Sequence, residues 1–178
     1  MRGLVLGSIV FVLVTGCTFR EVTPWQVGAP PAQPPSTLVL GHIGVANPLW
    51  EGSTQVFRRG VWDWLGRNGG FQSVLIEAPT SPPPDSVVLK GTITDISRGS
   101  EALRVFVGWG LGSPWVRGTF DITRLNGTVL NSFTARGAYS AGAGGKAAHD
   151  IDVDDLMRQF AETVAKATRR WAQSKGVQ

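Results

Sequence analysis

The strongest constraint on the fold is a pair of alternating segments on either side of an Asn-Gly dipeptide. Apolar and polar side chains alternate in residues 115–124, and the chain returns in residues 128–139 after Asn126-Gly127. Asn-Gly between alternating segments is typical of a two-residue hairpin turn, and a period of two places the apolar side chains on one face. The side chains expected on that face are Val116, Phe120 and Ile122. The sequence therefore predicts an antiparallel hairpin whose apolar face needs a cover.

The clearest candidate for the cover is an amphipathic helix at the end of the chain. Asp150 or Asp152 is expected to cap its start, and Gly176 fits a C-cap. Apolar residues recur every three or four positions after the cap, which is the spacing of one helix face. The members of this stripe are Val153, Leu156, Phe160, Val164, Ala167 and Trp171.

A second helix is predicted earlier in the chain. Ser53 or Thr54 is the candidate N-cap, and Gly66 or Gly69 is expected to end the helix. Its apolar face comprises Phe57, Val61, Trp64 and Leu65.

The remaining strands are predicted from short apolar runs. They fall at residues 37–46, 72–78, 86–97 and 103–109, and the Pro-rich residues 79–84 read as a loop. The predicted order is β-α-β-β-β-β-β-α. This order indicates an α+β domain with a mainly antiparallel sheet of about six strands covered by two helices. A single domain is expected over residues 37–178, which is long enough to bury a core without disulfides.

The first residues have the layout of an export signal. Arg2 precedes an uncharged, mostly apolar run that ends at Val14, and small residues lead to Cys17, the only cysteine. A run of about 12 residues would be only about 18 Å long as a helix, too short for a bilayer core of about 30 Å. The sequence therefore predicts a signal peptide over residues 1–16 rather than a transmembrane helix.

The residues around the predicted cleavage point resemble the lipobox of bacterial lipoproteins, in the form Val14-Thr15-Gly16-Cys17. The resemblance implies cleavage between Gly16 and Cys17, diacylglycerol on the Cys17 sulfur, and a third acyl chain such as palmitate on the new amino terminus. Two or more acyl chains anchor a protein stably. Thr18 stands where an Asp favours retention in the inner membrane, so the resemblance implies an anchor in the outer membrane, on its periplasmic face. A secreted protein with an incidental cysteine is the alternative.

Residues 17–36 are predicted to be a lipidated tether. They contain five prolines and few apolar residues, a composition typical of polyproline II linkers. At about 3.1 Å per residue, such a linker would hold the domain tens of ångströms from the bilayer.

Several segments resemble catalytic or ligand-binding motifs but lack essential residues. The run from Ser140 to Ala147 lacks the first glycine and the final Ser/Thr of a phosphate-binding loop. The acidic run that starts at His149 lacks the glycine and the bidentate Glu of a calcium loop, and His42 is isolated on an apolar strand. No Gly-x-Ser-x-Gly elbow is present. We therefore expect no enzyme activity, no metal and no cofactor.

The charge and the tryptophans point to different kinds of partner. A net charge of +4 without a Lys/Arg cluster excludes a typical nucleic-acid binder. Trp64 and Trp171, two of seven tryptophans, fit helix cores, whereas Trp109 and Trp115 flank a glycine-rich turn. Exposed aromatic side chains at a turn mark partner or membrane interfaces, and packing across the sheet remains the alternative for this pair.

Two motifs in the C-terminal two thirds carry a family resemblance. The strand Gly91-Thr92-Ile93-Thr94-Asp95 and the strand and turn from Arg104 to Gly110 resemble small bacterial lipoproteins of the domain-of-unknown-function 4410 family. The resemblance implies the lipobox and the final helix but no assigned activity. The layout is also similar to that of envelope lipoproteins involved in curli secretion.

Two functions are therefore expected as alternatives. The first is a non-enzymatic outer-membrane lipoprotein that docks on other cell-envelope proteins through its sheet edge or its Trp109–Trp115 turn. The second is a periplasmic module that binds a lipid or other apolar ligand between sheet and helices. An apolar cavity would favour the second function, and a filled core with exposed tryptophans would favour the first.

Overall fold

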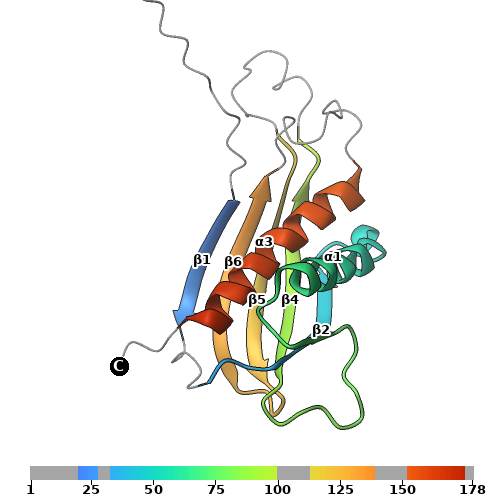
Figure 1. The fold of residues 1–178 in the computed structure, drawn as a ribbon. Helices are drawn as coiled ribbons and strands as arrows, with labels where there is room; N and C mark the ends of the chain where they lie inside the picture. Colours follow the sequence, from blue (N-terminus) through green and yellow to red (C-terminus); the bar gives the residue numbers. More distant parts are fainter. Residues whose placement is uncertain (1–19, 28–32, 100–112, 139–151, 175–178) are drawn as a thin grey trace, which may run out of the picture.

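The protein folds into one sheet with both long helices on the same face (Figure 1). The computed structural model describes residues 20–27, 33–99, 113–138 and 152–174. The strands are β1 (Arg20–Val27), β2 (Thr37–Val45), β3 (Ser73–Leu75), β4 (Val87–Ser97), β5 (Trp115–Arg124) and β6 (Val129–Ala138). The helices are the short 3₁₀ helix η1 (Pro48–Trp50), α1 (Ser53–Asn68) and α3 (Val153–Gln173).

The strands lie in the order β1-β6-β5-β4-β2-β3. Each neighbouring pair among the first four strands is antiparallel, whereas β2 pairs in parallel with both β4 and β3. The parallel pairs arise because α1 carries the chain back to the starting end of β2, so that the next strands run in the same direction. The predicted α+β class, the six strands and the two covering helices are confirmed, and the sheet is mixed.

β1 corrects the prediction of an unpacked tether over residues 17–36. Residues 20–27 instead pair with β6, from Arg20 opposite Gly137 to Val27 opposite Asn131. Proline lacks a backbone N–H and is tolerated on edge strands and at bulges. Pro24 meets both conditions, because β1 is an edge strand and its register shifts between Pro24 and Gln26. The prolines therefore did not exclude a strand. The predicted strand at residues 103–109 lies outside the described residues.

The helix ends differ slightly from the predictions. Gly52, without a capping side chain, precedes α1 in place of Ser53 or Thr54, and Gly69 ends α1 as expected. Asp152 caps α3 by accepting a hydrogen bond from the Asp155 amide at 2.7 Å. α3 ends at Gln173 with Ser174 as the C-cap, before Gly176. None of the helices in the described ranges is long and apolar enough to span a membrane.

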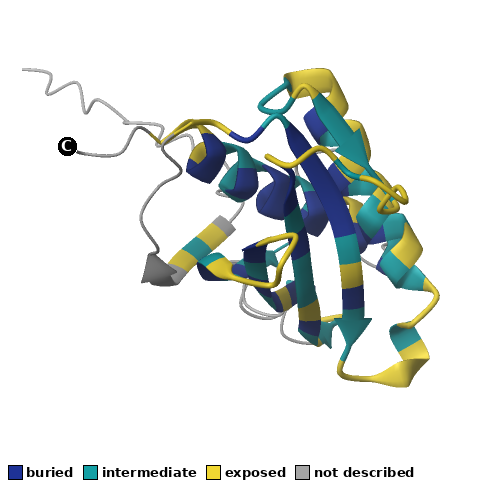
Figure 2. Ribbon diagram, turned by 90° about the horizontal axis from the view of Figure 1, so that it is seen from below, coloured by how far each residue is buried: buried dark blue, intermediate teal, exposed yellow. Residues whose placement is uncertain are grey.

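The core lies between the helices and the sheet and is built around four phenylalanines. Phe120 of β5 packs against Phe57, Phe133 and Phe160, with ring centroids 5.5 to 5.9 Å apart. All four rings are at most 2% exposed, and the buried residues lie along the inner sides of the helices and strands (Figure 2). The aromatic rings fill the space that an apolar ligand would need.

α1 and α3 cross at a glycine. A Cβ atom added to Gly60 of α1 would lie 2.8 Å from the Cβ of Ala161 on α3, which is closer than carbon atoms normally approach. The two helices therefore cross at a distance that only a glycine permits at this position. The crossing fixes how both helices lie on the sheet.

Candidate functional site

The described structure contains only one of the residues singled out as site candidates. Trp115 is the first residue of β5 and is half-buried. Gly16, Cys17 and Trp109 lie outside the described residues. The proposed lipidation site and the far side of the Trp109–Trp115 turn are therefore not placed by the structure.

Trp115 lies beneath two arginines. The guanidinium carbon of Arg136 is 4.8 Å from the centroid of the indole ring, and that of Arg117 is 5.5 Å from it. Alternation along β5 places Trp115 and Arg117 on the same face of the sheet, opposite the face on which Val116 and Phe120 enter the core. Trp115 therefore belongs to a cation–π cluster on the face that the helices leave open.

The hairpin register explains why these three side chains meet. Arg117 pairs with Arg136, and Trp115 pairs with Ala138. The turn closes with the Arg124 amide donating to the Thr128 carbonyl at 2.8 Å, and a register shift between Ile122 and Thr123 then brings residue 117 opposite residue 136. This irregularity is not evident from the Asn-Gly turn signal, and the sequence analysis missed both arginines.

Each of these arginines has an acidic residue opposite it in the ladder. Arg117 pairs with Asp95 of β4, and Arg136 pairs with Glu21 of β1. Thr94 donates a hydrogen bond to the Asp95 carboxylate at 3.0 Å, and Thr23 donates to Glu21 at 3.4 Å. The acids reduce the net positive charge of the cluster without removing it from the surface, because Arg117 is exposed and Arg136 is half-buried.

A second arginine–tryptophan pair lies at the same end of the sheet. η1 follows the end of β2, and its Trp50 lies 4.9 Å beneath the guanidinium carbon of Arg98, which follows the end of β4. Asn47 caps η1 by accepting a hydrogen bond from the Leu49 amide at 3.1 Å. This cap holds the Leu49 side chain outward, 82% exposed.

A cleft of about 710 Å³ follows the outer edge of β2. β3 pairs with β2 only from Thr37 to Val39, so within the described ranges no strand lies beside β2 beyond Val39. Residues 39–45 of β2 line this cleft, together with Thr54, Gln55 and Arg58 of α1. Arg58 donates hydrogen bonds to the carbonyls of Leu40 and Ile76, and thereby links α1 to both sides of the cleft.

A further cleft, of about 1090 Å³, lies over the crossing of α1 and α3. Trp64 lines this cleft, and Lys166 and Arg169 lie 5.7 and 6.0 Å from the centroid of its ring. Most of the other lining residues are charged or polar. Both clefts therefore differ from the apolar pocket expected of a lipid-binding module.

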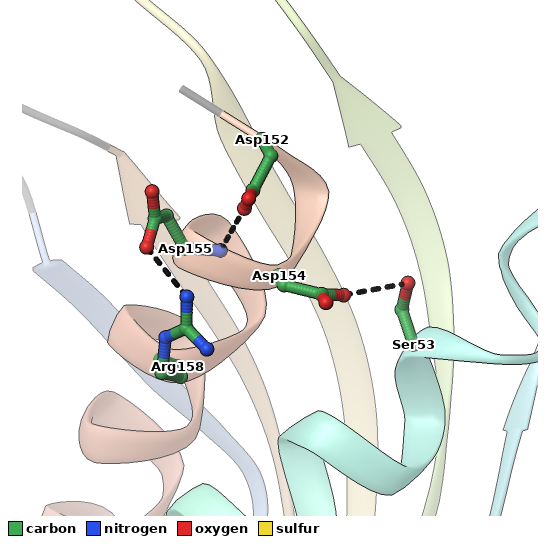
Figure 3. Close-up of polar contacts among 5 residues, drawn as sticks. All are labelled: Ser53, Asp152, Asp154, Asp155 and Arg158. Atoms are coloured by element: carbon green, nitrogen blue, oxygen red, sulfur yellow. Dashed lines mark hydrogen bonds and ion pairs between the residues drawn. The ribbon is translucent and has the colours of Figure 1, made fainter. Parts of the chain in front are cut away.

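The acidic run at the start of α3 stabilises the helix (Figure 3). Asp152 caps the helix, Asp154 accepts a hydrogen bond from Ser53 of α1 at 3.3 Å, and Asp155 pairs with Arg158 at 2.6 Å. The hydrogen bond that Arg158 donates to the Asp155 carboxylate raises the pKa of Arg158. No group of three metal-ligating side chains occurs in the described part of the chain. These aspartates have structural partners, as the capping interpretation of the sequence predicted.

Comparisons with known proteins give a family and a distant fold likeness. A search of curated proteins finds no match. Among solved structures, the chain is similar to a single-substitution variant of PelC from Paraburkholderia phytofirmans, described as a dodecamer. The likeness has 18% identity and a TM-score of 0.49, and covers 90% of this chain and 100% of that chain. A second PelC dodecamer structure from the same organism gives 17% identity and a TM-score of 0.46, with 82% and 96% coverage.

The family match begins in the last turns of α1 and takes in β3 to β6. Residues 65–143 match the family model described as domain of unknown function, DUF4410. This range contains the Gly91–Asp95 strand and the Arg104–Gly110 segment on which the resemblance rested. Over residues 65–143 the chain is therefore similar to the DUF4410 family, as the sequence motifs predicted.

Proposed function

We propose that the protein is a lipid-anchored lipoprotein of the outer membrane, facing the periplasm, that acts without catalysis by docking on other cell-envelope proteins. The lipobox-like sequence at Cys17 supports the anchor. The open edge of β2 is the observation that carries the docking role. An edge strand presents unpaired backbone donors and acceptors to which an extended segment of another protein can add.

The cleft beside β2 has the features of a strand-addition site. β3 stops after Leu75, and the Leu40 carbonyl accepts a hydrogen bond from Arg58, so an added strand would continue the line of β3 along residues 41–45 of β2. The Arg58 guanidinium is occupied by two backbone carbonyls, and His42 and Glu77 are exposed at the rim. Backbone pairing would supply affinity, and the rim side chains would supply selectivity.

The alternative, a module that binds an apolar ligand, has less support. The space between sheet and helices is occupied by the rings of Phe57, Phe120, Phe133 and Phe160. Of the described tryptophans, Trp62 is 42% exposed and Trp115 is half-buried. A filled core with partly exposed tryptophans is the arrangement that favours docking.

Site-specific cross-linking in intact cells tests the docking role. A photo-reactive amino acid at His42, in the β2 cleft, is expected to capture the same discrete envelope protein in repeated experiments. The same group at Leu125, at the far end of the β5–β6 hairpin and 42% exposed, is the matched control. Capture at Leu125 but not at His42 would refute docking through the β2 edge.

The anchor is tested separately with Cys17→Ala. The parent chain is expected in the membrane fraction, with acyl groups on its amino-terminal peptide by mass spectrometry. Cys17→Ala is expected to lack these groups and to lose the captured partner. Without any acyl mass on the parent chain, the lipoprotein proposal fails.

A further inference from the structure

The distance between Cys17 and the sheet is limited by the chain itself. β1 begins at Arg20, three residues after Cys17, and three residues span at most about 11 Å when fully extended. A lipid on Cys17, which the proposed function supplies, would therefore hold the starting end of β1 close to the bilayer surface. The sheet would lie at the membrane rather than at the end of a long tether.

The strand register shows which residues share that end. Arg20 pairs with Gly137 of β6, and Gly137 pairs with Val116 of β5. Trp115, one residue before Val116, therefore lies two strands from β1, or about 10 Å away at a strand spacing of about 4.8 Å. In Figure 1 this is the upper end of the sheet, where β1 begins and β6 ends.

The side chains at this end combine aromatic rings with guanidinium groups. Arg117 and Arg136 lie over Trp115, and the neighbouring pair is Trp50 beneath Arg98. Leu49, 82% exposed, lies beside Trp50. Tryptophan favours the boundary between lipid and water, and arginine binds phosphate through paired hydrogen bonds.

We propose that this end of the sheet rests on the phospholipid headgroups of the membrane that holds the Cys17 lipid, with Trp115, Arg117 and Arg136 as the principal contacts. Glu21 pairs with Arg136 and Asp95 pairs with Arg117 on the neighbouring strands. Their negative charges keep the net positive charge of this surface small. The surface therefore orients a domain that the lipid already anchors. The strands then run away from the membrane, and the Asn126-Gly127 turn lies at the opposite end.

Quenching of tryptophan fluorescence by headgroup-spin-labelled phospholipid tests this orientation. The acylated protein is purified from membranes and reconstituted into phosphatidylethanolamine vesicles with and without phosphatidylglycerol. Trp115→Phe is expected to lose most of the quenching seen in the parent. Trp62→Phe is the matched control, because Trp62 is 42% exposed and donates a hydrogen bond to Val74 of β3, which pairs near the opposite end of the sheet. This variant is expected to keep the quenching.

The arginines are tested in the same vesicles. The double variant Arg117→Gln, Arg136→Gln is expected to reduce the quenching and its dependence on phosphatidylglycerol. A matched pair on the helix surface, Arg59→Gln and Arg67→Gln, is expected to change neither. Unfolding curves in urea confirm that each variant is folded.

The possible outcomes separate the orientation from the anchor. Equal quenching in Trp115→Phe and Trp62→Phe, on protein shown by mass spectrometry to carry acyl groups, would overturn the headgroup contact and leave the anchor standing. Absence of acyl groups would overturn both. Loss of quenching only in Trp115→Phe and in the Arg117, Arg136 double variant supports the contact.

Discussion

Replacing Gly60 and Gly66 of α1 by alanine should have opposite effects on stability. Both glycines lie inside the same helix, and alanine is favoured over glycine there by about 0.8–1 kcal/mol. A Cβ at Gly66 meets nothing within 4 Å, whereas a Cβ at Gly60 would lie 2.8 Å from the Cβ of Ala161. Gly66→Ala should therefore stabilise the protein by nearly the full propensity difference.

At Gly60 the close crossing of α1 and α3 opposes the gain in stability that alanine would bring to the helix. Forcing an extra methyl group into a packed contact costs about 1–3 kcal/mol, so Gly60→Ala should be destabilising by up to about 2 kcal/mol after the propensity gain. The two variants should then differ by roughly 1–3 kcal/mol in free energy of unfolding. With a urea dependence of about 1–3 kcal/mol per molar, this is a difference of roughly 1 M in the unfolding midpoint.

Urea unfolding followed by tryptophan fluorescence measures both variants against the parent. Adding Ala161→Gly to Gly60→Ala removes the opposing methyl group and should recover part of the loss, with a coupling of about 0.5–3 kcal/mol. A Gly60→Ala variant as stable as Gly66→Ala, or a double variant with no coupling, would refute the close crossing of α1 and α3.

Two further predictions concern the phenylalanine core and the hydrogen bond between Ser36 and Asp85. Phe120→Ala should cost about 3–5 kcal/mol of unfolding free energy in urea, because its ring contacts three other buried phenylalanines, whereas Leu125→Ala on the exposed turn should cost less than about 0.5 kcal/mol. Hydrogen bonds from Ser36 lower the pKa of Asp85, and the Ser36 amide lies 3.0 Å from its carboxylate. Asp85→Asn should therefore lower the urea midpoint at pH values above the ordinary Asp pKa. The difference between the variant and the parent should vanish as the pH falls through the lower pKa that Asp85 has in the folded state. A difference that persists in acid would count against this contact.

The sequence predicted best the elements whose local pattern matches their final environment. The β5–β6 hairpin was confirmed because its alternation and its turn residues point to the same structure. α3 was confirmed because its apolar stripe is buried almost throughout. In both elements, local preference and tertiary burial agree.

β1 was missed because its pairing depends on a partner more than 100 residues away. Residues 20–27 have no apolar alternation of their own, and they become a strand only because β6 offers an open edge. The arginine cluster over Trp115 has a similar origin, since Arg136 reaches Trp115 through the strand register and has no local link to it. Local patterns contain neither kind of information.

The pairing of β1 with β6 also sets the order in which the sheet can form. The first strand in the described part of the chain needs residues 131–137, so the sheet cannot be completed until most of the chain has been made and β6 has formed. Pairings of such long sequence separation form slowly, because the loop must close before the contact stabilises it. Until then the outer edge of β6 exposes unpaired backbone groups to neighbouring chains, which is the condition that promotes aggregation. Substitutions that weaken β1 should therefore lower the yield of folded protein more than its final stability.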